Sequence, residues 1–292
     1  MFDKYGKCLY EEPLKNHTTY KVGGIAKVIV YPNSVDNLIK LLKQLKKDNE
    51  KFMVLGRGSN VIVSSKYFDG VVINLEELDY YSIQDDIITA GAGTSIIKIA
   101  TISARENLSG LEFAAGIPGS LGGGVFMNAG AYKSAFSDII QSVKYLDKDF
   151  NIKTINKENI NFGYRDSIFK HNKDMIVIEA TMKFSQKPYE EIKEIIDDRK
   201  KRRVESQPLE YPSAGSVFRN PEEIPAGKLI EDLGLKGYQI GGAKVSEKHA
   251  NFIINAGDAT GEDIRDLINY IKDKVKKEAN IDLILEQELI NF

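Results

Sequence analysis

Hydrophobic residues recur at helical spacing in some stretches and at strand spacing in others, which predicts a mixed α and β protein. From Val35 to Leu45 the apolar residues fall every three or four positions, which predicts a helix with one apolar face. Ser34 precedes this stretch and is expected to be the N-cap of the helix. Phe52–Leu55 and Val61–Val63 are short apolar runs of the kind that form strands.

The same two patterns continue to the end of the chain. Further helices are predicted to begin at Ser95, Pro188 and Thr260, and further strands are predicted at Val28–Tyr31, Ile87–Ala90, Val143–Leu146, Met175–Phe184 and Leu283–Ile290. Period-two alternation in the terminal strand places four side chains on one face, namely Ile284, Glu286, Glu288 and Ile290. The predicted fold class is therefore α+β.

Composition and charge exclude several classes of protein. With 292 residues the chain is long enough for two or three domains, and its formal net charge of −2 gives no field that would gather nucleic acid. The basic run Arg199–Arg203 is interpreted as cations at the end of the helix from Pro188, because acidic residues precede it. The single cysteine, Cys8, excludes an internal disulfide, and no stretch has the pattern of a signal peptide or membrane span. We expect a cytoplasmic protein without a metal site.

The most unusual stretch is Gly110–Ala131, GLEFAAGIPGSLGGGVFMNAGA, which holds seven glycines and has no charged residue after Glu112. Glycine at this density lets a backbone approach another group closely. A membrane span would need apolar side chains throughout, and a flexible linker would lack the buried-type residues Phe113 and Val125. The stretch therefore predicts a glycine-rich loop folded against a large flat ligand.

A second glycine turn, Gly56–Asn60, follows the strand Phe52–Leu55 and reads LGRGSN with the preceding leucine. It is close to the start of a dinucleotide-binding fingerprint, but Val61 replaces the third glycine and a strand follows where a helix is required. Successive backbone N–H groups in such a turn can still bind a diphosphate. On the turn alone, an ordinary hairpin is the better interpretation.

Taken together, the two glycine stretches resemble the flavin-binding loops of the bacterial UDP-N-acetylenolpyruvoylglucosamine reductases, the MurB enzymes of peptidoglycan precursor synthesis, and the resemblance extends over nearly the whole chain. It implies a two-subdomain FAD-binding fold of the vanillyl-alcohol-oxidase type plus a C-terminal α/β substrate domain. The expected boundaries are 1–75 and 76–186 for the FAD-binding subdomains and 187–292 for the substrate domain.

The resemblance also implies which residues bind FAD. The expected set is Gly56, Arg57, Gly58, Ser59, Asn60, Ala115, Gly116, Ile117, Gly119, Ser120, Gly122, Gly123, Asn128, Gly130 and Ala131. Noncovalent binding is expected because neither loop contains a His or Cys that could tether the flavin. NADPH as the reductant is likewise implied by the family.

Three catalytic residues are carried over from the family's motifs: Arg165 of the Tyr164-Arg165 pair, Ser216 within SAGSVF, and Glu288 within LEQE. A guanidinium suits the substrate carboxylate on which negative charge develops, the serine is the family's proton donor, and the glutamate assists it. Without the resemblance, a surface ion pair of Arg165 with Asp166 and a turn role for Ser216 are favoured. For Glu288, without the resemblance, a charge on an exposed edge strand and a functional carboxylate are equally favoured.

The implied substrate is a UDP-sugar whose diphosphate needs hydrogen-bond donors. The expected substrate-binding residues are Tyr164, Asn220, Lys228, Lys236 and His249. For each lysine the alternative is an ordinary solvated surface residue. Two departures from the family are noted: Ile290 stands where a basic residue is common, and the short span before Arg165 indicates the smaller form, which lacks an extra tyrosine loop.

The expected function is NADPH-dependent, FAD-mediated reduction of UDP-N-acetylglucosamine enolpyruvate to UDP-N-acetylmuramate by a monomer. One alternative is another FAD-dependent oxidoreductase of the same superfamily that acts on a different small molecule. A second alternative is a non-catalytic nucleotide-binding protein, which would keep the glycine loops without needing Arg165, Ser216 and Glu288 together.

Overall fold

The computed structural model describes residues 2–292 and divides the chain into two compact units. The first unit contains the chain up to Tyr10 together with Val28–Arg57 and Gly70–Arg202. The second unit contains Glu11–Lys27, Gly58–Asp69 and Arg203–Phe292. The expected three-part division at residues 75 and 186 stays a prediction.

One sheet is built from the first third of the chain. Its four strands, in spatial order, are β1 (Gly6–Pro13), β2 (Ile25–Pro32), β5 (Phe68–Asn74) and β3 (Phe52–Leu55). The helix α1 (Val35–Lys47) is capped as predicted, since the Ser34 side chain accepts a hydrogen bond from Asn37 N at 3.2 Å. Its buried face joins the core of the first unit through Leu38, Leu41, Leu42 and Leu45.

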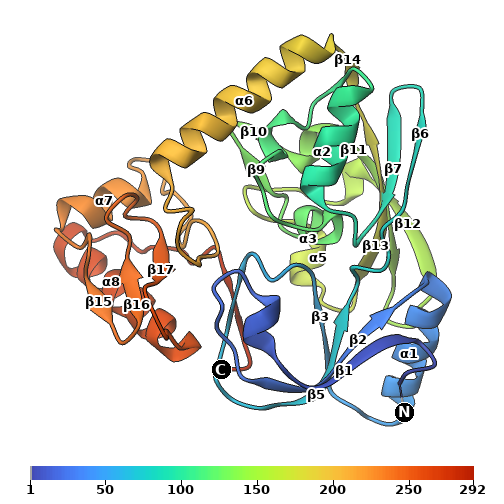
Figure 1. Ribbon diagram of the computed structural model, residues 1–292, viewed down its shortest axis with the longest axis horizontal. Helices are drawn as coiled ribbons and strands as arrows, with labels where there is room; N and C mark the ends of the chain where they lie inside the picture. Colours follow the sequence, from blue (N-terminus) through green and yellow to red (C-terminus); the bar gives the residue numbers. More distant parts are fainter. Residues whose placement is uncertain (1) are drawn as a thin grey trace. The chain divides into compact units, whose positions relative to one another are not determined.

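The larger sheet of the first unit is antiparallel throughout. Its five strands, in spatial order, are β12 (Ile152–Asn156), β11 (Ile140–Leu146), β13 (Ile176–Lys183), β7 (Ile87–Gly91) and β6 (Tyr81–Gln84). The helices α2 (Ile96–Arg105) and α3 (Leu121–Phe126) share a buried core with this sheet (Figure 1). The core thus positions the glycine-rich loop, because α3 is part of it.

Short elements complete the first unit. They are β8 (Leu108–Ser109), η2 (Glu112–Ala114), β9 (Gly130–Ala131), β10 (Ser134–Ala135), α4 (Phe136–Ile139), η3 (Lys157–Asn159), α5 (Ile168–His171) and β14 (Ser185–Gln186). The long helix α6 (Tyr189–Ser206) contains the boundary between the units, at Arg202.

The second unit has a separate core around a small antiparallel sheet. The strands are β15 (Gln239–Ile240), β16 (Ala243–Val245) and β17 (Ile253–Asn255), and the other elements are η1 (Leu14–His17), α7 (Ala226–Asp232) and α8 (Gly261–Ala279). Apolar residues of α8, among them Ile264, Leu267 and Ile271, pack in this core. Two strands far apart in sequence, β4 (Val61–Val63) and β18 (Glu288–Ile290), pair in parallel.

Two sequence-based predictions were wrong in detail. The terminal strand is only Glu288–Ile290, because its partner β4 has only three residues. Residues before it bond to another segment instead, with Arg219 N donating to Ile284 O at 2.9 Å. Ile284 therefore lies outside the terminal strand, and its side chain is 60% exposed. The helix α6 also continues past the basic run to Ser206.

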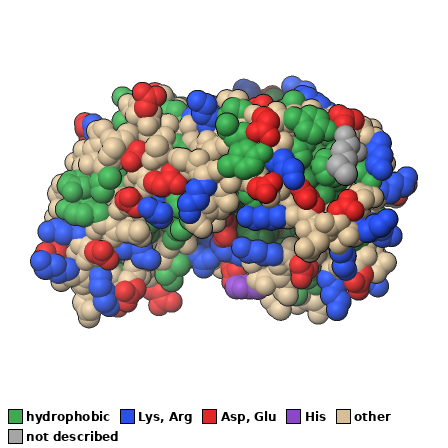
Figure 2. Space-filling view, turned by 90° about the horizontal axis from the view of Figure 1, so that it is seen from below, with side chains coloured by type: hydrophobic (Ala, Val, Ile, Leu, Met, Phe, Trp, Pro, Cys, Tyr) green, Lys and Arg blue, Asp and Glu red, His purple; other side chains and the backbone are tan. Residues whose placement is uncertain are grey.

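Charges of both signs are distributed over the surface. On the face drawn in Figure 2, Lys and Arg side chains are interspersed with Asp and Glu. Exposed ion pairs such as Lys98–Asp79, at 2.9 Å, contribute little to stability. Among residues 2–292, no helix is long and apolar enough to cross a membrane.

The N-terminus of α8 gives a test of the fold. Thr260 Oγ1 accepts a hydrogen bond from Asp263 N at 3.0 Å, and Asp263 Oδ2 accepts one from Thr260 N at 2.9 Å. Thr260→Ala should lower the free energy of unfolding by about 1 kcal/mol, because it removes a capping side chain. We expect the midpoint of thermal unfolding to fall by roughly 2–4 °C. Asp273→Ala, on the exposed part of the same helix, is the control, and an unchanged midpoint in Thr260→Ala would contradict the capping role.

Candidate functional site

The glycine-rich loop reaches its position through backbone hydrogen bonds at the start of α3. Leu121 N donates to Thr94 O at 2.8 Å, and Gly122 N donates to Ala92 O at 2.9 Å. The Ser120 side chain caps the helix by accepting a hydrogen bond from Gly123 N at 3.4 Å. The predicted residues Ala115, Gly116, Ile117 and Gly119 form the connection between η2 and this cap.

The three consecutive glycines of α3 have different surroundings. A Cβ on Gly122 would lie 3.0 Å from Ala92 Cβ, and one on Gly124 would lie 2.7 Å from the Phe136 ring, so packing explains both glycines. Gly123 is exposed, and a Cβ there would meet only Ser120 Oγ, at 3.4 Å. Because glycine costs roughly 1 kcal/mol relative to alanine inside a helix, the glycine at 123 is unexplained by the protein alone. It fits a surface that a ligand approaches closely.

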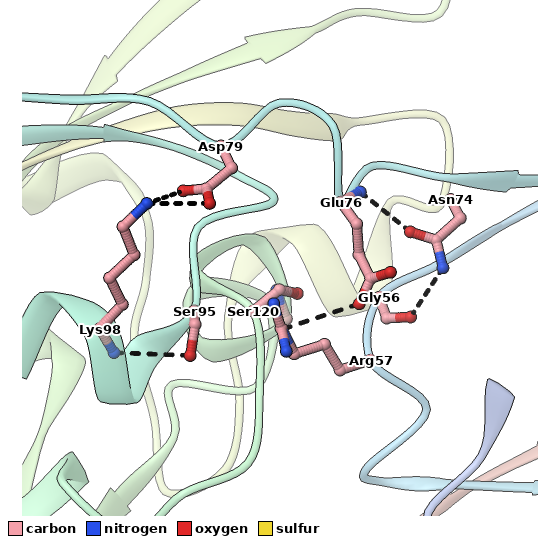
Figure 3. A network of polar contacts seen from close by, with 9 residues as sticks. Gly56, Arg57, Asn74, Glu76, Asp79, Ser95, Lys98 and Ser120 are labelled. Atoms are coloured by element: carbon pink, nitrogen blue, oxygen red, sulfur yellow. Dashed lines mark hydrogen bonds and ion pairs between the residues drawn. The ribbon is translucent and has the colours of Figure 1, made fainter. Parts of the chain in front are cut away.

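The first glycine turn begins beside this helix. A Cβ on Gly56 would lie 2.7 Å from Ser120 Oγ, so the turn and the helix cap are in close contact. The buried Asn74 fixes the turn, donating from Nδ2 to Gly56 O at 3.5 Å and accepting from Glu76 N at 2.9 Å (Figure 3). Arg57 Nε lies 3.8 Å from Glu76 Oε1 in the same view. A cation is thus held beside the turn that is predicted to bind a diphosphate.

The rest of the first glycine turn belongs to the second unit. Gly58 has a φ of +61°, and a Cβ there would overlap His17 O, so only glycine fits. Asn60 contacts the end of the chain, with Nδ2 donating to Glu286 O at 3.3 Å and its carbonyl accepting from Glu288 N at 3.0 Å. The strand β4 follows the turn, as the sequence predicted, so no Rossmann helix is present there.

Arg165 lies in a tight turn of the first unit. Gly163 N donates to Asp166 O at 3.0 Å, and Arg165 has a φ of +55°, a conformation uncommon for residues other than glycine. Its guanidinium donates to Gly130 O at 2.5 Å and lies 5.2 Å from the centre of the Tyr164 ring. The structure therefore brings Tyr164 and Arg165 next to the end of the glycine-rich loop.

Asn128 ties this turn to the glycine-rich loop. Its Nδ2 donates to Gly163 O at 2.8 Å, and its Oδ1 accepts from Ser137 N at 2.9 Å. Both ends of the amide therefore bond to backbone of the first unit, and the side chain is buried. Gly130 and Ala131 form β9, which pairs with β10.

Ser216 lies in a segment of the second unit that forms hydrogen bonds with Asn251 on one side and with Glu286 on the other. The buried Asn251 accepts from Phe218 N at its Oδ1, at 3.0 Å, and donates from Nδ2 to Phe218 O at 2.8 Å. On the other side, Glu286 N donates to Val217 O at 2.8 Å. The fold thus places the segment of Ser216 next to the segment that leads to Glu288.

The predicted substrate-binding residues of this unit surround α7. Asn220 Oδ1 accepts from Ala226 N at 3.1 Å, at the start of that helix. Lys228 forms an ion pair with Asp232, and Lys236 forms one with Glu231 at 2.7 Å. Both lysines are held by carboxylates of the helix, and their contact with the substrate stays a prediction.

His249 is positioned by the backbone of Asn251. Asn251 N donates to His249 Nδ1 at 3.2 Å, so the neutral ring carries its proton on Nε2. Burial lowers the pKa of His249, so the ring is neutral at neutral pH. It can therefore donate one hydrogen bond to an anionic ligand without adding a charge.

Sequence analysis missed two amides of these sites. Asn74 gives no sequence signal beyond its place at the end of a strand. Gln287 lies between two glutamates, which give no signal of burial, but it is 3% exposed and donates to Ala214 O at 3.1 Å. Among residues 2–292, no group of three or more His, Cys, Asp or Glu side chains could hold a metal ion.

Comparison with known proteins decides the family. A family model of the FAD binding domain matches residues 26–156, and one of the UDP-N-acetylenolpyruvoylglucosamine reductase C-terminal domain matches residues 207–290. The reductase of that name from Bacillus pumilus is 44% identical over 286 residues, covering 98% of this chain and 94% of the relative. The chain belongs to the UDP-N-acetylenolpyruvoylglucosamine reductase family.

Further relatives agree with this membership. The reductase of Caldanaerobacter subterraneus is 46% identical over 287 residues, covering 98% of this chain and 95% of the relative. The crystal structure of the enzyme from Thermus caldophilus superposes with a TM-score of 0.83 at 32% identity, covering 97% of this chain and 98% of that one. The predicted family and fold class, an FAD-binding fold with a C-terminal substrate domain, are confirmed.

Gly123 gives a test of the flavin site. Gly123→Val should leave the apoprotein folded, because the added side chain points away from the core, but the purified protein should contain little flavin. Visible absorbance and the melting temperature of the apoprotein measure the two effects separately. Gly124→Ala is the contrasting variant, since its Cβ meets Phe136 and should lower the apoprotein's melting temperature. Full flavin content in Gly123→Val would exclude this glycine from the cofactor surface.

Proposed function

We propose that this protein catalyses the NADPH-dependent, FAD-mediated reduction of UDP-N-acetylglucosamine enolpyruvate to UDP-N-acetylmuramate, a step of peptidoglycan precursor synthesis. The observation that carries the proposal is the 44–46% identity to reductases of this name over 98% of the chain. The C-terminal domain model, which matches residues 207–290, covers the segments of Ser216 and Glu288. We further propose that the enzyme acts as a cytoplasmic monomer.

The residues of the two glycine stretches fit FAD. Gly123 presents a bare exposed backbone, and Arg57 lies beside the turn as a cation for a diphosphate. The remaining contacts are proposed for the residues implied by the resemblance, from Gly56 to Asn60 and from Ala115 to Ala131. When bound, FAD would supply the hydride chemistry of the reaction, with NADPH as the reductant.

In the first unit, Arg165 is proposed to bind the carboxylate of the enolpyruvyl group. Hydride addition at C3 moves negative charge toward C2 and this carboxylate, and a guanidinium stabilises that charge with two parallel hydrogen bonds. The hydrogen bond to Gly130 O and the contact with the Tyr164 ring hold the guanidinium in one orientation. Less of its conformational entropy is then lost when the substrate binds.

In the second unit, Ser216 is proposed to donate the proton that completes the reaction at C2. The hydride and this proton together add two hydrogens across the double bond, and the proton comes ultimately from solvent. Glu288 is proposed to assist at the same enol, as a carboxylate that orients the serine hydroxyl. Asn220, Lys228, Lys236 and His249 are proposed to bind the UDP-sugar.

Ser216→Ala tests this function because it separates the two half-reactions. NADPH should bleach the flavin of the variant at nearly the parental rate, since no proton is delivered to carbon in that step. Reoxidation by the enolpyruvyl sugar should slow by roughly 10²–10⁴-fold, the range of general acid catalysis. Stopped-flow absorbance follows each half-reaction alone. Ser216→Cys keeps a proton donor and should recover part of the rate, whereas unchanged reoxidation in Ser216→Ala would remove the serine from the mechanism.

A further inference from the structure

Gln287 joins the two catalytic segments of the second unit through one buried amide. Its side chain is 3% exposed, and Nε2 lies 3.1 Å from Ala214 O and 3.4 Å from both Gly215 O and Ser216 O. Its Oε1 accepts a hydrogen bond from Tyr20 OH at 3.1 Å. Both ends of the amide are therefore bonded, as buried polar groups require.

The backbone on either side of Gln287 is fixed by Asn60. Asn60 Nδ2 donates to Glu286 O at 3.3 Å, and Asn60 O accepts from Glu288 N at 3.0 Å. The parallel pairing of Glu288 with Val61 continues this attachment. Gln287 thus projects its amide from a position that strand pairing determines.

The segment that receives the amide includes Gly215 in a left-handed backbone conformation. This glycine has a φ of +77°, and a Cβ placed on it would find no heavy atom within 4 Å. The hydrogen bonds between Asn251 and the backbone of this segment begin at Val217, whose N donates to Asn251 O at 2.9 Å. The carbonyls of residues 214–216 are held from the other side by Gln287 Nε2.

Tyr20 completes the arrangement from a third segment. Its ring is fully buried, and its hydroxyl donates to Gln287 Oε1. Burial raises the pKa of Tyr20, so the phenol stays protonated and keeps a hydrogen to donate. The carbonyls of residues 214–216 can only accept, so Nε2 of the Gln287 amide must face them and Oε1 is left to accept from the hydroxyl.

We infer that Gln287 and Tyr20 are positioning residues for proton delivery, which hold the Ser216 hydroxyl in register with Glu288. The inference rests on the proposed function, because it concerns the step in which Ser216 donates its proton. Both side chains are buried, so the role inferred for them is positioning and not contact with the substrate. A shift of about 1 Å in a catalytic group can cost roughly 10²-fold in rate, so a hydrogen bond that sets the backbone at Ser216 can control the rate of protonation.

Gln287→Met and Tyr20→Phe test the inference by stopped-flow absorbance. Methionine has nearly the shape of glutamine but cannot donate to the three carbonyls, so reoxidation by the enolpyruvyl sugar should slow by roughly 10- to 100-fold. Tyr20→Phe keeps these donors and removes only the hydrogen bond to Oε1, so a slowing of a few-fold is expected. Bleaching by NADPH should stay at the parental rate in both variants. The solvent deuterium isotope effect on reoxidation should increase, because proton transfer becomes more nearly rate-limiting.

A double-mutant cycle with Ser216→Ala separates positioning from general support of the fold. If Gln287 acts through the serine hydroxyl, adding Gln287→Met to Ser216→Ala should leave the reoxidation rate unchanged. The inference would be overturned if Gln287→Met slowed reoxidation by the same factor in the Ser216→Ala background as in the parent. Equal slowing of both half-reactions would overturn it as well. Should Gln287→Met fail to fold, the same cycle with Tyr20→Phe decides, and a parental reoxidation rate in Tyr20→Phe would also overturn it.

Thr260→Ala is the control for stability, since it weakens α8 without touching this network. It should lower the melting temperature and leave both half-reactions at parental rates. The parent protein is measured first with the enolpyruvyl sugar. If its reduced flavin is not reoxidised, the proposed function fails; if it is, the ratio of variant to parental rate judges the role of Gln287 alone.

Discussion

The parallel pairing of β18 with β4 is the interaction on which the site of the second unit depends. It places the last residues of the chain beside the strand that follows the first glycine turn. Glu288 is fixed by this pairing, and Asn60 bonds to the backbone on both sides of Gln287. Because the segment of Ser216 is bonded in turn to residues 284–287, three distant parts of the sequence share one hydrogen-bonded arrangement.

The glycine-rich loop shows a different constraint, the close approach of backbone to its neighbours. Gly122 and Gly124 let α3 lie against Ala92 and Phe136, while Gly123 faces outward. Three successive glycines cost helix stability, roughly 1 kcal/mol each relative to alanine. The hydrogen bonds of Leu121 N and Gly122 N to the segment before α2 offset part of that cost. One short helix thus combines tight packing on one side with a bare surface on the other.

Buried amides are the recurring means of connecting segments in this protein. Asn74 links the first glycine turn to the residues after β5, Asn128 links the glycine-rich loop to the turn of Arg165, and Gln287 links Ser216 to the chain's end. An amide offers donors and an acceptor at fixed geometry, and burial makes an unmade bond costly. Each link therefore favours one arrangement of its segments over the alternatives, which is what a site with several participating loops requires.

Local features of the fold could be predicted from short-range patterns in the sequence. Ser34 and Thr260 as helix caps, the strand Val61–Val63 after the glycine turn, and the family's motifs around Arg165, Ser216 and Glu288 could all be read from neighbouring residues. Caps, alternation and motifs depend on residues a few positions apart, so one chain suffices to recognise them. The family resemblance supplied the fold class in the same way.

Features that depend on partners far away in the sequence became visible only in the folded chain. The terminal strand was predicted too long, because its length is set by β4, more than two hundred residues away in sequence. The sequence gives no signal that Gln287 is buried, and its burial follows from the carbonyls of residues 214–216 and the hydroxyl of Tyr20. Hydrophobic patterning assigns polar side chains to solvent, since it contains no information on the buried partners that can satisfy them.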